Sequence, residues 1–169
     1  ASAAGFATLL RGCAAVIHSA SRTTPGDSAG RALAEVQANL VPLMHLLEAL
    51  QENPVPLLYL SSGGALYDAE PGRGAREDDR CRPRSYYGAG KLAAEYFIRA
   101  WASQFRGAAT LLRPSNVYGP GQTARSGFAI IPTAMHRILR GEALSIWGDG
   151  SARRDYLYID DLVDLCIRI

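Results

Sequence analysis

The sequence predicts an α/β fold in which helices cover both faces of a parallel sheet. Short apolar runs that suit buried strands alternate with longer stretches in which apolar residues recur every three or four positions, as they do in helices. Polar segments directly follow the strand-like runs, and parallel sheets bind their ligands at the carboxyl ends of the strands. Strands that alternate with helices are typical of this fold class.

Two strands and a helix are predicted in the first part of the chain. Residues 14–20 (AAVIHSA) form an apolar, β-branched run that suits a buried strand. After a loop of Gly, Ser and Pro, leucines and valine recur at helical spacing over residues 31–52. Residues 54–62 (PVPLLYLSS) give a second strand that ends in a Ser/Gly turn.

A further helix and a third strand complete the predicted first domain. Helical spacing returns over residues 86–105, and residues 108–113 (AATLLR) give a strand that Pro114 ends. We assign residues 1–121 to this domain.

The elements become shorter over residues 122–169, which we expect to begin a smaller second lobe. Residues 129–140 suit a helix, and LSIW (144–147) and YLYI (156–159) suit short strands. A last helix opens at Asp160, the first of two aspartates that we interpret as N-capping residues.

The composition is that of a globular protein, with 48% hydrophobic and 20% charged residues among 169. The net charge of +2 and the scattered basic residues give no reason to expect a nucleic-acid partner. Cys13, Cys81 and Cys166 are far apart and form no CxxC pair, so we expect no disulfide framework and no metal site, as fits the cytoplasm. Because no apolar run approaches about 18 residues, we expect no membrane span.

A single lysine among eighteen basic residues is the most informative feature of the site. Lys91 follows Tyr87 by four positions, and residues at this spacing share one face of a helix. A free phenol has a pKa of about 10, and a cation about 4 Å away could lower that pKa by about three units at most. The pair therefore suggests proton transfer, although a surface tyrosine with a chance lysine nearby is the alternative.

The order of six motifs extends this interpretation to nearly the whole chain. They are VIHSAS, Asn39, LSSGGALYD, SYYGAGKLAAE, LLRPSNVYGPGQ and GDGSARRDYLYIDDL. In this order the sequence resembles the extended short-chain dehydrogenase/reductase family, the NAD-dependent epimerases and dehydratases of nucleotide sugars, and especially its UDP-glucose 4-epimerase-like members. The resemblance implies a Rossmann-type, doubly wound parallel sheet that is partial here, with the N-terminal βαβ units missing, followed by the start of a substrate-binding lobe.

The resemblance implies that NAD is the cofactor, with NADP left open. Tyr87 corresponds to the catalytic acid/base, and Lys91 to its partner, which also holds the nicotinamide ribose. Two formal GxGxxG/A matches, from Gly88 and Gly119, do not follow a strand while opening a helix, so we expect the glycine-rich phosphate turn upstream of residue 1. Both ends of the chain suggest a piece of something longer.

The family's catalytic hydroxyl lies four residues before a tyrosine that corresponds to Tyr67, a position that Gly63 occupies here. We therefore expect the neighbouring Ser62 to donate the catalytic hydrogen bond. Ser61 is the less favoured substitute and is expected to contact the cofactor. The alternative is that both serines only finish the strand and cap the turn.

The next two positions restrict the reaction. Related dehydratases carry an Asp–Glu pair where this chain has Gly64 and Ala65. The chain therefore lacks the acid and the base that elimination of water requires at these positions. The resemblance then leaves epimerisation, or net reduction of a keto-sugar.

Further cofactor contacts are implied at Ala20, Asn39 and Pro114. Ala20 corresponds to a small residue whose backbone lies against the cofactor, and Asn39 to a helix asparagine that orders the active-site end of its helix. Pro114 would lie near the nicotinamide. We interpret His18, inside the first strand, as a core histidine.

The implied substrate contacts are Asn116, in the loop after the third strand, and Trp147 and Arg154 in the second lobe. Asn116 and Arg154 would bind the diphosphate, for which a guanidinium is well shaped, and Trp147 would lie near the nucleotide base. A structural pair between Arg154 and Asp155 and a core role for Trp147 are the alternatives. Ala129 stands where some relatives carry a uracil-binding Asn, so a UDP-sugar is favoured but the base stays open.

Together these features predict an NAD-dependent nucleotide-sugar epimerase. The alternatives are an NADPH-dependent keto-sugar reductase of the same family and a non-catalytic remnant. The helices at 31–52 and 86–105 resemble the family's dimer-forming pair, which suggests a homodimer.

Overall fold

The computed structural model describes residues 2–68, 73–124, 129–146 and 148–169. The chain forms two compact units, Ala1–Arg113 and Pro114–Ile169. The second unit therefore begins a few residues before the boundary that we placed after residue 121.

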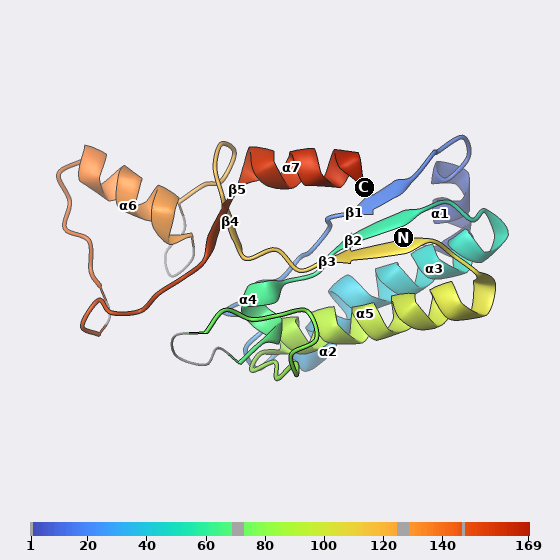
Figure 1. Cartoon of the computed structure of the whole chain (residues 1–169), viewed down its shortest axis with the longest axis horizontal. Coiled ribbons are helices and arrows are strands. Elements are labelled where there is room, and N and C mark those ends of the chain that lie inside the picture. Colours follow the sequence, from blue (N-terminus) through green and yellow to red (C-terminus); the bar gives the residue numbers. More distant parts are fainter. Residues whose placement is uncertain (1, 69–72, 125–128, 147) are drawn as a thin grey trace. The chain divides into compact units, whose positions relative to one another are not determined.

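A parallel sheet forms the centre of the first unit (Figure 1). Its strands are β1 (Val16–His18), β2 (Leu57–Leu60) and β3 (Ala109–Leu112), in the order β1-β2-β3. All three lie within the predicted strand regions, and both pairings are parallel. The predicted α/β fold with a parallel sheet is thus confirmed.

The two long helices of the first unit pack against this sheet. Its helical segments are α1 (Ala3–Leu9), α2 (Ala32–Glu35), η1 (Val36–Leu40), α3 (Val41–Glu52), α4 (Gly63–Leu66) and α5 (Tyr86–Phe105). Figure 1 shows α3 and α5 side by side along one face of the sheet. Their apolar faces supply most of the core, in which Leu43, Leu50, Leu57 and Ile98 are almost completely buried.

The predicted helix over 31–52 contains a wide turn. In η1 the backbone N–H of Val41 donates to the carbonyl of Val36, five residues earlier, as in a π-helix. The cause lies in Pro42, which has no N–H to donate and whose ring would clash with the carbonyl of Ala38 in a regular α-helix. The wide turn removes that clash and allows the helix to continue into α3.

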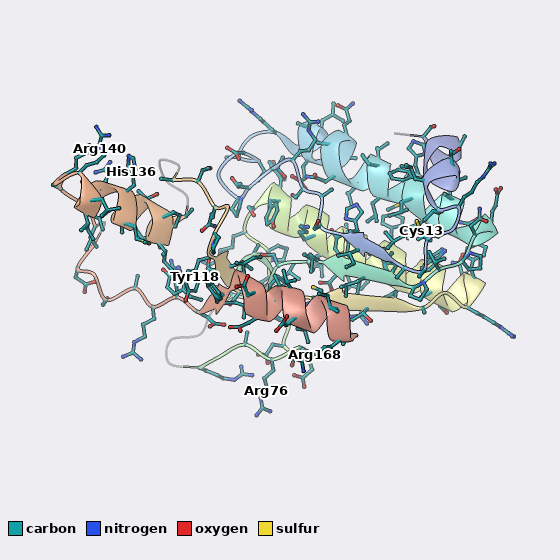
Figure 2. The ribbon with its side chains drawn as sticks, turned by 90° about the horizontal axis from the view of Figure 1, so that it is seen from above. Cys13, Arg76, Tyr118, His136, Arg140 and Arg168 are labelled. Carbon is teal, nitrogen blue, oxygen red and sulfur yellow. The ribbon has the colours of Figure 1, made fainter. Side chains whose placement is uncertain are left out.

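The second unit contains a parallel pair of short strands, β4 (Asn116–Tyr118) and β5 (Tyr156–Tyr158). Tyr118, labelled in Figure 2, meets the rings of Tyr156 and Tyr158 in edge-to-face geometry, with centroids 6.2 and 5.6 Å away.

Two helices, α6 (Ile130–Leu139) and α7 (Ile159–Arg168), complete the described part of the second unit. Residues 144–146 form no strand, contrary to prediction, and Trp147 lies outside the described residues. The predicted N-capping role of the aspartates is also wrong. Tyr158 is at the N-cap, and Asp160 and Asp161 lie inside the first turn, where carboxylates favour the positive end of the helix dipole.

Candidate functional site

Two hydrogen bonds from backbone N–H groups hold the first turn of α5, which carries Tyr87. Ser85 is the N-cap of the helix, and its hydroxyl accepts a hydrogen bond from the N–H of Gly88 at 3.1 Å. The N–H of Tyr87 donates to Ser28 Oγ at 3.1 Å, and Ser28 is fully buried. Two N–H groups that a helix start leaves unpaired are thereby satisfied, and the position of Tyr87 is fixed.

Lys91 lies one turn further along α5 and is buried, with 6% of its surface exposed. Its Nζ donates to the carbonyl of Leu60, the last residue of β2, at 2.7 Å. The same nitrogen lies 4.9 Å from the ring centroid of Tyr59 and 5.8 Å from that of Tyr87. The structure therefore brings Tyr87 and Lys91 together at the carboxyl end of the sheet, as their spacing predicts.

The charge state of the pair differs from the sequence-based expectation. Burial raises the pKa of the Tyr87 phenol, a hydrogen bond with the Ser62 hydroxyl lowers it, and the negative charge of Glu35 raises it further. The net direction is upward, opposite to the lowering that we expected from the cation of Lys91. Burial in turn lowers the pKa of Lys91 to about 8, against an opposing contribution from Glu35.

The Ser/Gly turn after β2 lies directly against the start of α5. A side-chain carbon on Gly88 would come within 2.5 Å of the carbonyl oxygen of Ala65, so only glycine permits this approach. Ser62 occupies the N-cap position of α4, but its side chain makes no capping hydrogen bond and instead interacts with Tyr87. Ser61 is buried, and its N–H donates to the carbonyl of Leu112 at 2.7 Å.

Asn39 orders the loop after β1. Its Nδ2 donates to Thr23 Oγ1 and to Glu35 Oε1, both at 2.8 Å, and its Oδ1 accepts from the N–H of Arg22 at 2.9 Å. Both amide hydrogens are thus used within the protein. A direct contact of Asn39 with a cofactor stays a prediction, whereas its contribution to local order is visible.

Two residues near this site were not identified from the sequence. Ser28 gave no signal, because its partner Tyr87 lies far away in the chain. Glu35 is 3% exposed and is the buried residue of α2. Its spacing of four residues from Asn39 places both on one helix face and could have indicated a polar cluster.

A partly buried ion pair joins α5 to the residue that follows β3. Arg113, at the end of β3, binds Glu95 with two hydrogen bonds, from Nε to Oε1 at 2.9 Å and from Nη2 to Oε2 at 2.6 Å. The same guanidinium donates to the hydroxyl of Tyr67 and to the carbonyl of Glu77, the latter at 3.0 Å. This arrangement links α5, β3 and the segment after α4.

Of the other predicted cofactor residues, Ala20 is exposed and follows β1, and Pro114 opens the second unit. Asn116 Nδ2 donates to the carbonyl of Asp155 at 2.8 Å. Arg154 is exposed and donates to the carbonyl of Arg153 at 2.7 Å, and the described residues show no ion pair between it and Asp155. Trp147 cannot be placed, since it lies outside the described part of the chain.

The donor set around Lys91 fits the ribose of a dinucleotide. An ammonium group has three N–H donors, and among the described residues one of them has an acceptor, the Leu60 carbonyl. The hydroxyl groups of a ribose are of a kind that could accept from the remaining donors. Among all the described residues, no three His, Cys, Asp or Glu side chains are grouped as a metal site would require. No helix within these residues is long and apolar enough to cross a bilayer.

Comparison with known sequences decides the family. The sequence profile of the NAD-dependent epimerase/dehydratase family matches residues 3–169. The chain belongs to this family. Membership in the NAD-dependent epimerase/dehydratase family confirms the resemblance that the six ordered motifs indicated.

Relatives within the family include proteins of different activity. The chain is 33% identical over 135 residues to a UDP-glucose 4-epimerase of Mycolicibacterium smegmatis, covering 79% of this chain and 43% of the relative. It is 32% identical over 149 residues to a dTDP-4-dehydro-6-deoxyglucose reductase of Escherichia coli, covering 88% and 47%. The crystal structure of Thermus thermophilus UDP-glucose 4-epimerase in complex with NAD is similar with a TM-score of 0.89 at 27% identity, covering 98% of this chain and 56% of that one. The chain thus spans about half the length of these relatives.

Proposed function

We propose that this chain carries the catalytic half of an NAD-dependent epimerase that acts on a nucleotide-diphosphate sugar, in the manner of UDP-glucose 4-epimerases. The convergence of Tyr87, Lys91 and Ser62 at the carboxyl end of the sheet carries this proposal. The names of the relatives support the substrate class, and the NAD in the related crystal structure supports NAD as the cofactor, with NADP left open.

The proposed mechanism assigns a proton shuttle to Tyr87. Its Oη would accept the proton of the sugar hydroxyl while the hydrogen on the same carbon leaves as hydride. After the keto-sugar has turned over, the hydride would return to the other face of that carbon and Oη would return the proton to the oxygen. Ser62 donates a hydrogen bond to the reacting oxygen, and Lys91 stabilises the tyrosinate and holds the ribose. When bound, the oxidised nicotinamide supplies the hydride acceptor and a second positive charge beside the phenol.

The raised pKa of Tyr87 gives this second charge a role. Burial disfavours the tyrosinate in the chain alone, and a cation brought beside the phenol lowers its pKa. A cofactor cation beside the phenol would therefore favour the tyrosinate that acts as the base.

The site offers no carboxylate for elimination at the turn after β2, where Gly64 and Ala65 lie. This favours epimerisation, and a keto-sugar reductase is the second candidate because the Escherichia coli relative is a reductase. Asn116, Arg154 and Trp147 are the proposed substrate contacts, and a homodimer is the proposed assembly.

The test is the interconversion of UDP-glucose and UDP-galactose by the full protein, compared with its Tyr87→Phe variant. Loss of the shuttle should lower the rate at least about 100-fold while the circular dichroism spectrum stays that of the wild type. Tyr86→Phe is the matched control, because the neighbouring tyrosine is 46% exposed and should retain full activity. A fully active Tyr87→Phe variant would remove Tyr87 from its proposed role.

The fate of the cofactor separates the candidate functions. An epimerase recycles bound NAD, whereas a reductase consumes NADPH in proportion to product. Calorimetric titration with NAD and with UDP identifies a non-catalytic remnant, which would bind neither.

A further inference from the structure

Two buried side chains of opposite charge lie in the first unit without a close ion pair. Glu35 is 3% exposed and Lys91 6% exposed, and neither forms a salt bridge with any residue that the structure describes. The carboxylate of Glu35 accepts hydrogen bonds from Thr23 Oγ1 at 2.5 Å and from Asn39 Nδ2 at 2.8 Å. Both partners are neutral, so the negative charge needs compensation from elsewhere in the interior.

The carboxylate of Glu35 lies directly against α5 at Gly90. A side-chain carbon on Gly90, the residue before Lys91, would come within 2.6 Å of Glu35 Oε1. Glycine at this position therefore allows the carboxylate to approach the helix that carries the lysine. The rest of α2 is exposed, so the carboxylate is the part of this short helix that faces inward.

The other groups that face Lys91 carry no negative charge at neutral pH. Tyr59 of β2 and Tyr87 of α5 present their rings to the ammonium, and the pKa of each phenol is raised, chiefly by burial. His18 of β1 has a pKa lowered by burial and then by the charge of Lys91, so it is neutral too. Glu35 of α2 is the remaining group.

One further carboxylate, that of Glu95, follows Lys91 by one turn of α5. Both of its oxygens are bound by Arg113, which compensates its charge. Among the described residues this leaves Glu35 as the uncompensated anion near the lysine.

We propose that Glu35 is the buried counter-charge of Lys91 and keeps its ammonium protonated at neutral pH. Glu35 is thus a positioning residue, which acts through the lysine and touches no substrate. Its importance for turnover rests on the proposed function, whereas the coupling of the two charges does not.

The single lysine of the chain makes this coupling directly measurable. After expression with ¹³C-labelled lysine, the chain gives one Cε resonance, assigned by its loss in Lys91→Arg, and its titration reports the pKa of Lys91. Glu35→Gln removes the charge but keeps the shape, and should lower this pKa by on the order of one unit. Glu48→Gln, the same change at an exposed position of α3, should leave it unaltered. An unaltered pKa in Glu35→Gln would overturn the proposal.

A second variant separates charge from packing. Thr23→Val removes a hydrogen-bond donor to Glu35 but keeps its charge, so the pKa of Lys91 should stay at the wild-type value or rise. A fall like that in Glu35→Gln would show that the shape of the cluster controls the lysine, and would overturn the proposal. An inactive full protein in which Glu35→Gln still lowers the pKa would contradict the proposed function and support the coupling.

Discussion

At the scale of single residues, the structure explains why the chain has a lysine at position 91 although it uses arginine elsewhere. The ammonium is nearly enclosed, donates to the end of β2 and lies above two tyrosine rings. A compact ammonium on a flexible stem fits this space, and its pKa responds to burial, whereas a guanidinium keeps its charge. The residue type therefore makes the charge of the site adjustable.

The spacing of Tyr87 and Lys91 was sufficient to predict their convergence, because positions four apart share a helix face whatever surrounds them. The direction of the phenol pKa was not predictable. It depends on burial and on Glu35, which lies far away in the sequence, and tertiary packing alone brings them together. Local geometry was predictable here, and electrostatics was not.

The burial of Lys91 should make the stability of the chain depend on pH. Its pKa is about 8 in the folded state and 10.5 without the fold, so between these values the unfolded chain holds more protons. The contribution of Lys91 to the free energy of unfolding should therefore rise with pH between 8 and 10, by at most about 1.4 kcal/mol per pH unit. Urea denaturation at pH 8, 9 and 10 should show this rise in the wild type and not in Lys91→Met. Equal pH dependence in both proteins would contradict it.

At the scale of elements, α5 organises the candidate site. Its first turn approaches the Ser/Gly turn, its second holds Lys91, and its third carries Glu95, which is bound to Arg113. Both long helices and the strands of the sheet could be predicted, because their apolar residues follow a clear period. The short elements α4 and β4 were missed, since four- and three-residue segments in Gly-rich surroundings have no period to detect.

The close approach of Gly88 to the Ser/Gly turn should make this position intolerant of a side chain. Gly88→Ala would place a carbon 2.5 Å from the carbonyl of Ala65, so α5 and the turn must move apart, at a cost of about 1–3 kcal/mol. Gly64→Ala is the matched control, because its side-chain carbon would meet nothing within 4 Å. Chemical denaturation of both variants measures the difference, and equal stabilities would show that the contact can relax freely.

At the scale of the whole molecule, the bounds of the two compact units correspond in outline to the two parts predicted from the sequence. The cofactor- and substrate-binding roles of these parts stay predictions. The boundary itself was predictable only roughly. Residues 116–118 look like a loop after the third strand, but they pair with residues 156–158, and no local pattern reveals this long-range partner.

The proposed homodimer can be tested on the face of α5 that points away from the sheet. Tyr96 and Phe97, consecutive residues of α5, are 66% and 51% exposed, and large exposed apolar side chains are candidates for an association surface. Phe97→Glu should shift the full protein from dimer to monomer in sedimentation velocity experiments. Met135→Glu, at a comparably exposed apolar residue of α6, should leave the assembly unchanged. A wild-type protein that sediments as a monomer would contradict the proposal.

The wide turn at η1 makes the length of this segment as important as its composition. Each residue of a helix turns the chain by about 100°, so removing one residue between Val36 and Leu40 would rotate α2 by that angle relative to α3. The carboxylate of Glu35 would then leave its place against Gly90, although no amino acid in contact with Lys91 had been exchanged. Homologous chains that keep this electrostatic arrangement should therefore tolerate exchanges along the segment far better than insertions or deletions.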